Sequence, residues 1–154
     1  MDSKILLRLK EIYAQSVFLE NKINELLTGI EPEASQYDIL IVEDDNSTSM
    51  VLADFLEIKG YSSLGVTTGN RAIEELNRSI PKLVLLDIIL PDLSGYEICQ
   101  KIKSDENLKD VPVFYITAIP ESEVSKKMEE TGADGFILKP FNFSDFEALF
   151  DYLN

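Results

Sequence analysis

From Tyr37 onward, short runs of β-branched and aliphatic residues alternate with longer amphipathic stretches, and this alternation limits the possible folds more than any other feature. Such alternation is typical of βαβ units, in which helices connect parallel strands and cover the sheet. The sequence therefore predicts a doubly wound α/β domain. Five strands are predicted, at residues 39–42, 62–66, 83–86, 113–117 and 136–138. Five helices are predicted to begin near Ser47, Asn70, Gly95, Glu121 and Ser144, with capping boxes of Ser94 with Glu97 and of Ser144 with Glu147.

The length of the chain limits its domain organisation. With 154 residues there is room for one compact domain and one appended element, but not for a second full domain. Residues 3–28 contain neither Gly nor Pro and are predicted to form one helix, which Gly29 and Pro32 end. Residues 1–36 are therefore predicted to form an N-terminal amphipathic α-helix with a linker, and residues 37–154 the folded domain.

The charge balance opposes several classes of partner. The chain has 14 basic and 28 acidic residues, and a net charge of -14 opposes binding to nucleic-acid phosphates and to anionic lipid. No apolar run approaches the roughly 20 residues needed to cross a bilayer, and no secretory leader is recognisable. We therefore expect a cytoplasmic protein with no direct DNA binding and no membrane contact. Because the chain has no histidine, it cannot itself be a histidine kinase.

Charged and polar residues stand where four of the predicted strands end. Glu43 and Asp44 follow the first strand, Asp87 follows the third, Thr117 ends the fourth, and Lys139 follows the fifth. The carboxyl ends of parallel strands meet at one edge of the sheet, which is where open α/β folds bind their ligands. Crowded carboxylates repel one another unless a cation lies among them, and Mg²⁺ prefers carboxylate oxygens completed by water and phosphate oxygens. The pattern predicts a phosphoryl-transfer site.

Five segments, taken together with their spacing, point to a family. They cover residues 42–44, 86–95, 117–118, 132–136 and 139–141, with 30 residues from Asp87 to Thr117 and 22 from Thr117 to Lys139. Over residues 38–154 the chain resembles the receiver domain of two-component response regulators. The resemblance implies a flavodoxin-like, five-stranded parallel sheet with the strand order 2-1-3-4-5.

The resemblance also implies a role for each site residue. Asp87 is expected to be the phosphoacceptor, with Lys139 and Thr117 completing the catalytic set. The expected Mg²⁺ ligands are Glu43, Asp44, Asp87 and the backbone carbonyl of Ile89.

A conformational switch is implied by the same resemblance. Thr117 is expected to move toward the phosphoryl group, which frees space for the ring of Phe136 to turn inward. Because Phe136 lacks the hydroxyl of a tyrosine, this switch would rely on packing alone. The Lys139–Pro140 peptide bond is expected to be cis.

The function that follows is that of a phosphoacceptor in a two-component (His-Asp) system. A sensor histidine kinase or a phosphotransfer protein would donate the phosphoryl group, and a downstream protein partner would receive the signal, since no output domain follows Asn154. The chain would not be an enzyme with a separate substrate, because it would catalyse only its own phosphorylation and dephosphorylation. The alternative is a pseudo-receiver that is not phosphorylated and acts as an interaction or dimerisation module. The presence of every expected site residue argues against that alternative.

Apolar residues of the N-terminal helix recur at alternating spacings of four and three. The positions are Ile5, Leu9, Ile12, Ser16, Leu19, Ile23, Leu26 and Ile30. Such a heptad seam, broken only at Ser16, is typical of a coiled coil. A homodimer through residues 5–30 is expected, while packing on its own receiver domain and docking to a partner's helix remain open.

Overall fold

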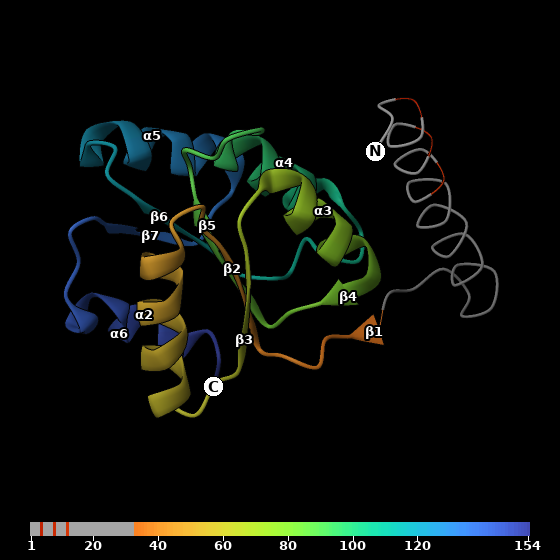
Figure 1. Cartoon of the computed structure of the whole chain (residues 1–154). Coiled ribbons are helices and arrows are strands. Elements are labelled where there is room, and N and C mark those ends of the chain that lie inside the picture. Colours follow the sequence, from red (N-terminus) through yellow and green to blue (C-terminus); the bar gives the residue numbers. More distant parts are fainter. Residues whose placement is uncertain (1–3, 5–7, 9–11, 13–32) are drawn as a thin grey trace. The chain divides into compact units, whose positions relative to one another are not determined.

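The computed structural model describes residues 33–154 and, from the N-terminal segment, Lys4, Arg8 and Ile12, each in a helix (Figure 1). The chain divides into two compact units, Met1–Glu33 and Ala34–Asn154. Apart from those three residues, the predicted N-terminal helix and its heptad seam lie outside the described residues.

A parallel sheet of five strands forms the centre of the second unit, in the order β3-β2-β5-β6-β7. Its strands are β2 (Ile39–Val42), β3 (Ser63–Val66), β5 (Leu83–Asp87), β6 (Val113–Thr117) and β7 (Gly135–Leu138). Counted along the chain within this sheet, the order is the expected 2-1-3-4-5. Each of the five predicted strands is confirmed, and no boundary differs by more than one residue.

Helices cover both faces of this sheet, as Figure 1 shows. On one face lie α3 (Gly69–Arg78), α4 (Gly95–Ser104) and α5 (Glu121–Thr131), and on the other lie α2 (Asn46–Ile58) and α6 (Glu147–Asp151). Successive side chains of a strand point to opposite faces, so each central strand contributes to two cores. In β2, for example, Leu40 and Val42 belong to the first core and Ile39 and Ile41 to the second. All residues of β2, β5 and β6 are buried, which explains why these strands are apolar except for the final Asp87 and Thr117, and which confirms the doubly wound fold.

Local capping chemistry fixes where the helices begin and end. Asp45, Thr68 and Ser94 precede α2, α3 and α4, and each side chain accepts a backbone N–H of the first turn. Gly132 follows α5 with a φ of 83°, in the left-handed region that favours glycine. The four helices predicted to begin near Ser47, Asn70, Gly95 and Glu121 are confirmed.

The C-terminal helix begins differently from the prediction. A 3₁₀ turn, η1 (Phe143–Phe146), precedes α6, and the capping box joins Asn142 to Asp145. The predicted box of Ser144 with Glu147 is therefore wrong. Asn142 has the extended backbone that an N-cap needs, and its N–H donates to Asp145 Oδ2 at 2.9 Å, so the turn starts two residues earlier.

A second sheet, of two strands, lies outside the central one. It pairs β1 (Glu33–Ala34) with β4 (Ser79–Ile80), and the N–H of Ser35 donates to the carbonyl of Ile80 at 3.1 Å. Two residues later, the hydroxyl of Tyr37 donates to Glu75 of α3 at 2.8 Å. The end of the predicted linker is thus attached to the domain.

Candidate functional site

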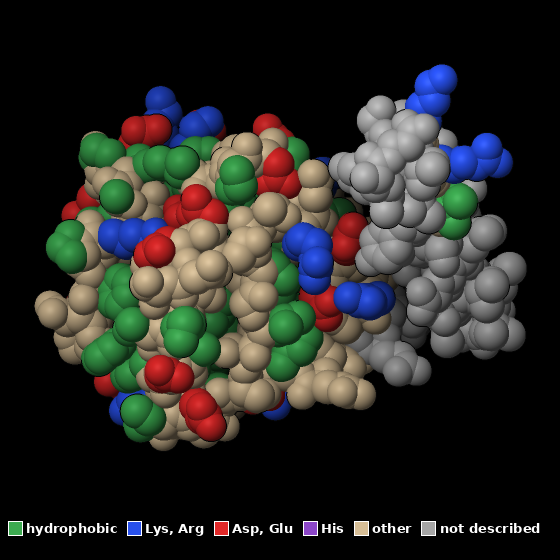
Figure 2. Space-filling view, viewed as in Figure 1, with side chains coloured by type: hydrophobic (Ala, Val, Ile, Leu, Met, Phe, Trp, Pro, Cys, Tyr) green, Lys and Arg blue, Asp and Glu red, His purple; other side chains and the backbone are tan. Residues whose placement is uncertain are grey.

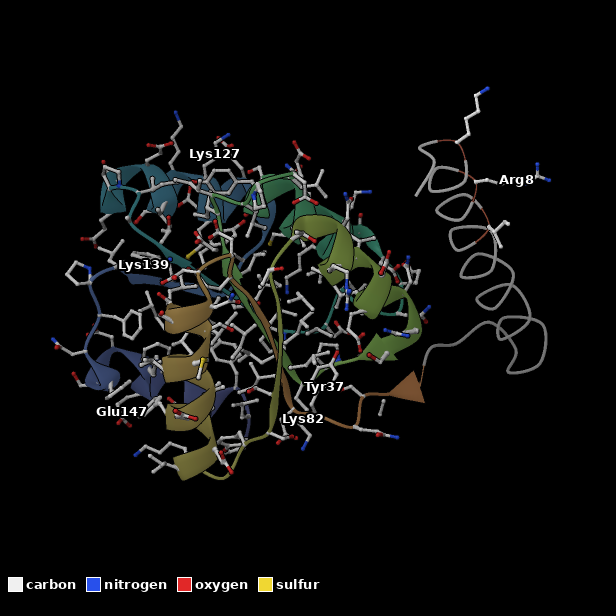
Figure 3. The ribbon with its side chains drawn as sticks, viewed as in Figure 1. Arg8, Tyr37, Lys82, Lys127, Lys139 and Glu147 are labelled. Atoms are coloured by element: carbon white, nitrogen blue, oxygen red, sulfur yellow. The ribbon has the colours of Figure 1, made fainter. Side chains whose placement is uncertain are left out.

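Asp87 is the last residue of β5 and lies at the carboxyl edge of the sheet, where it is 6% exposed. Its Oδ2 accepts a hydrogen bond from Lys139 Nζ at 3.1 Å, and its Oδ1 accepts one from the N–H of Ile89 at 3.2 Å. Lys139 follows β7, and its own N–H donates to the carbonyl of Thr117 at 2.8 Å. Figure 3 shows Lys139 near the N-terminal end of α2. The Lys139–Pro140 bond is cis, as expected.

Glu43 and Asp44 follow β2, which is the direct neighbour of β5 in the sheet. One carboxylate oxygen each from Glu43, Asp44 and Asp87 lie within 4.8 Å of one another. Glu43 is 1% exposed, and both of its oxygens accept hydrogen bonds from Lys139 Nζ at 3.0 Å. Two of the three carboxylates, those of Glu43 and Asp87, therefore share the ammonium of Lys139. An all-oxygen set with an excess of negative charge fits a hard divalent cation such as Mg²⁺.

The crowding of these groups shifts two pKa values. Burial is the main cause that raises the pKa of Glu43, to about 7, and the neighbouring Asp87 raises it further against the opposing effect of Lys139. For Lys139, burial alone would lower the pKa, but its hydrogen bonds to Glu43 and Asp87 outweigh burial and raise it. The ammonium of Lys139 therefore remains charged at neutral pH, while the carboxyl of Glu43 is harder to ionise than an ordinary glutamate.

Thr117 and Phe136 occupy the two strands beyond β5. Thr117 ends β6 and is completely buried, and its Oγ1 accepts a hydrogen bond from the N–H of Ile119 at 3.1 Å. Phe136 lies opposite Tyr115 in the β6–β7 register, and its half-buried ring packs against the core on the α3–α5 face. The structure thus brings Asp87, Glu43 and Lys139 into direct contact, whereas Thr117 and Phe136 lie on adjacent strands.

The turn from β5 into α4 brings the backbone very close to Asp87. A Cβ added to Gly95 would lie 2.3 Å from the carbonyl oxygen of Asp87, so only glycine fits at this position. Within this turn, the carboxylate of Asp92 binds backbone N–H groups of Gly69 and Asn70 at the start of α3. No role for Asp92 could be predicted from the sequence, because its partners lie 22 and 23 residues away and no spacing rule connects them.

The family model of the response regulator receiver domain matches residues 39–151, and the chain belongs to this family. It is 37% identical over 112 residues to the "Probable transcriptional regulator ycf27" of Porphyridium aerugineum, covering 71% of this chain and 45% of that protein. It is 31% identical over 116 residues to the polar-differentiation response regulator DivK of Brucella ovis, covering 75% of this chain and 94% of that protein. The chain therefore spans less than half of the ycf27 relative and nearly all of DivK.

A solved structure with the same fold carries a metal at its site. It is the receiver domain of sensor histidine kinase PA1611 from Pseudomonas aeruginosa, with a magnesium ion coordinated in the active site cleft. The two chains are 27% identical with a TM-score of 0.67, and the match covers 75% of this chain and 94% of that one.

Among the helices of the described residues, none has the length and apolar character that spanning a membrane would require.

Proposed function

We propose that this chain is a phosphoacceptor of a two-component (His-Asp) signal transduction system, phosphorylated on Asp87 with Mg²⁺ bound beside it. The observation that supports this most directly is the 3.1 Å contact of Asp87 with Lys139, within a cluster that also contains Glu43 and Asp44. A nucleophilic carboxylate, an ammonium and a cation site are the groups that phosphoryl transfer to an aspartate needs.

In the proposed reaction, a carboxylate oxygen of Asp87 attacks the phosphorus atom of the donor. A new P–O bond forms, and the bond from phosphorus to the leaving group breaks with its electron pair going to the leaving group. The Lys139 ammonium, which already contacts Asp87, would stabilise the negative charge of the phosphoryl oxygens. Mg²⁺, when bound, supplies further positive charge against these oxygens. Its ligands would be Glu43, Asp44, Asp87 and the backbone carbonyl of Ile89.

The proposed switch uses Thr117 and Phe136. The hydroxyl of Thr117 would donate to the phosphoryl group on Asp87, and the ring of Phe136 would then turn into the space that Thr117 leaves. Support comes from the half-buried position of Phe136 at the edge of a packed core, from which a modest rotation can bury more of the ring.

The proposed phosphodonor is a sensor histidine kinase or a phosphotransfer protein, and the proposed output is contact with a downstream protein in the cytoplasm. The helix α2 exposes Met50, Val51 and Ile58, and Figure 2 shows hydrophobic and acidic side chains together on this face of the domain. The net charge of -14 opposes direct DNA binding. The chain would therefore be a signalling protein that catalyses only its own phosphorylation and dephosphorylation.

The N-terminal segment is proposed to form a homodimer through residues 5–30, as a coiled coil. This proposal rests on the heptad spacing of the sequence alone.

Intact-mass measurement after incubation with acetyl phosphate and Mg²⁺ tests the function. The wild-type chain should gain one phosphoryl group, and Asp87→Asn should gain none. Asp44→Ala should need more Mg²⁺ to reach the same extent, because it removes a metal ligand. Asp110→Asn, which alters an exposed carboxylate elsewhere, should match the wild type. A wild-type chain that gains no phosphoryl group under these conditions would instead be a pseudo-receiver, an interaction module without phosphorylation.

A further inference from the structure

Hydrogen bonds join the two ends of the loop between β5 and α4, residues 88–94. The N–H of Ile89 donates to Asp87, the N–H of Gly95 donates to the carbonyl of Ile88 at 2.8 Å, and Ile89 and Ser94 form an isolated antiparallel bridge. The peptide of Ile89 therefore lies at the end of the loop that is next to the phosphorylation site.

The outer part of the same loop is attached to a different helix. Asp92 Oδ1 accepts a hydrogen bond from the N–H of Gly69 at 2.8 Å, and Asp92 Oδ2 accepts one from the N–H of Asn70 at 2.8 Å. Asp92 Oδ1 also accepts the N–H of Leu93 at 3.0 Å, which fixes the carboxylate relative to its own loop. Both oxygens of one side chain therefore join the β5–α4 loop to α3.

These contacts complete the first turn of α3. The first N–H groups of a helix have no partner inside the helix. At the start of α3, Thr68 Oγ1 accepts only the N–H of Arg71, at 3.1 Å, and Asp92 accepts the two before it. A carboxylate is favoured there by the partial positive charge of the helix N-terminus. The hydrogen bond from Asn70 is the largest cause that lowers the pKa of Asp92; burial opposes it, and the hydrogen bond from Gly69 lowers the pKa further.

The loop and the helix also touch through their carbon atoms. A Cβ added to Gly69 would lie 2.8 Å from the Cβ of Leu93, so the loop packs directly onto the first residue of α3. Because the helix belongs to the packed core through Ala72 and Leu76, it provides a rigid support for the loop.

We propose that Asp92 is a positioning residue of the phosphorylation site: by joining the β5–α4 loop to the start of α3, it holds the Ile89 peptide where its carbonyl can ligate Mg²⁺. The inference rests on the proposed function. Asp92 itself touches none of the reacting groups, so its effect passes through the backbone of the loop.

Titration calorimetry with MgCl₂ tests this on the full chain. Partners that orient a metal ligand directly contribute about 10- to 100-fold to affinity, and Asp92 acts more remotely, so Asp92→Ala should weaken Mg²⁺ binding about three- to tenfold. Asp92→Asn should have a smaller effect, because its one carbonyl oxygen can still accept one of the two α3 amides. In the metal-free protein, Asp92→Ala should also speed amide hydrogen exchange at Ile89 and Asn70.

Asp105→Ala is the matched control, because it also removes one negative charge and one carboxylate that accepts a backbone N–H, that of Asn107 at 2.8 Å. It should leave Mg²⁺ affinity unchanged within about twofold, since its partner lies in the same local turn. Wild-type affinity in Asp92→Ala, or equal weakening in both alanine variants, would overturn the positioning role while leaving the proposed function intact. A wild-type chain that binds no Mg²⁺ would overturn both.

Discussion

Removing the hydroxyl of Tyr37, in the variant Tyr37→Phe, is expected to destabilise the domain by about 1.5 to 2 kcal/mol. This hydroxyl donates to Glu75 Oε1 at 2.8 Å, and the carboxylate that accepts it is only 8% exposed. Phenylalanine keeps the ring, which packs against the core on the α3–α5 face, so the variant removes the hydrogen bond with little change in packing.

The magnitude follows from the partners that Glu75 keeps. A hydrogen bond to a charged group contributes about 1.5 to 3 kcal/mol. Arg78 still donates to Glu75 Oε2, at 3.0 and 3.2 Å, and Ser79 still donates to Oε1 at 3.1 Å. The carboxylate would lose one of several partners, so the lower part of that range is expected.

The expected effect depends on pH in a defined direction. Burial alone would raise the pKa of Glu75, but the hydrogen bonds from Tyr37, Arg78 and Ser79 outweigh it and lower the pKa below 4.5. A depressed pKa in the folded state gives stability that is present above the unfolded pKa and is lost as the pH falls through the folded value. The difference in the free energy of unfolding between wild type and Tyr37→Phe should therefore be largest near neutral pH and decrease as the pH falls. Burial raises the pKa of Tyr37 to about 12, so its hydroxyl remains a donor throughout.

Urea unfolding followed by circular dichroism, repeated at decreasing pH, measures this difference. Tyr61→Phe is a matched control, because the hydroxyl of Tyr61 donates at 3.1 Å to the exposed side chain of Asn154, and its loss should change the free energy of unfolding by less than about 0.5 kcal/mol. A Tyr37→Phe effect no larger than this control at neutral pH, or one that persists unchanged after Glu75 is protonated, would contradict the role of the Tyr37–Glu75 hydrogen bond in stability.

Two further predictions concern the turn after β5 and the N-terminal segment. Gly95→Ala should lower the free energy of unfolding by about 3 kcal/mol, because its Cβ would meet the Asp87 carbonyl at 2.3 Å. Urea unfolding measures this change, and a loss below about 1 kcal/mol would show that the turn can relax. Replacing Leu19 and Ile23 together with Glu should convert a dimer into a monomer in light scattering while residues 37–154 stay folded. A wild-type chain that is monomeric at micromolar concentration would contradict the dimer.

The central strands could be predicted because helices cover both faces of the sheet, and strands buried on both faces are apolar along their length. Every residue of β2, β5 and β6 is buried, so each strand appears in the sequence as an apolar run, which in β5 and β6 extends up to the final Asp87 and Thr117. The site could be predicted for a related reason, since the carboxyl ends of parallel strands converge whatever the details of packing. Asp87 and Lys139 are 52 residues apart in the chain, yet Asp87 Oδ2 and Lys139 Nζ lie 3.1 Å apart.

Two kinds of feature could not be predicted in this way, namely a choice between equivalent local spacings and a contact between distant segments. Ser144 and Glu147 have the spacing of a capping box, but Asn142 and Asp145 have it as well, and spacing alone does not choose between them. The hydrogen bonds of Asp92 to α3 and of Tyr37 to Glu75 join residues 22 to 38 positions apart. Neither contact leaves a periodic pattern, because each depends on how two finished elements pack.

The hydrogen bond of Thr117 provides a second route by which the conformational change proposed at the site can reach α5. A hydroxyl can accept and donate at the same time, so Thr117 can donate to a phosphoryl group while its Oγ1 still accepts the N–H of Ile119 at 3.1 Å. If that bond persists, movement of Thr117 pulls the backbone of residue 119, which lies two positions before the start of α5 at Glu121. The start of α5 would then respond through the backbone, in parallel with the repacking of Phe136. Replacing Phe136 should therefore weaken the response of α5 to phosphorylation without abolishing it, whereas Thr117→Val should remove both routes.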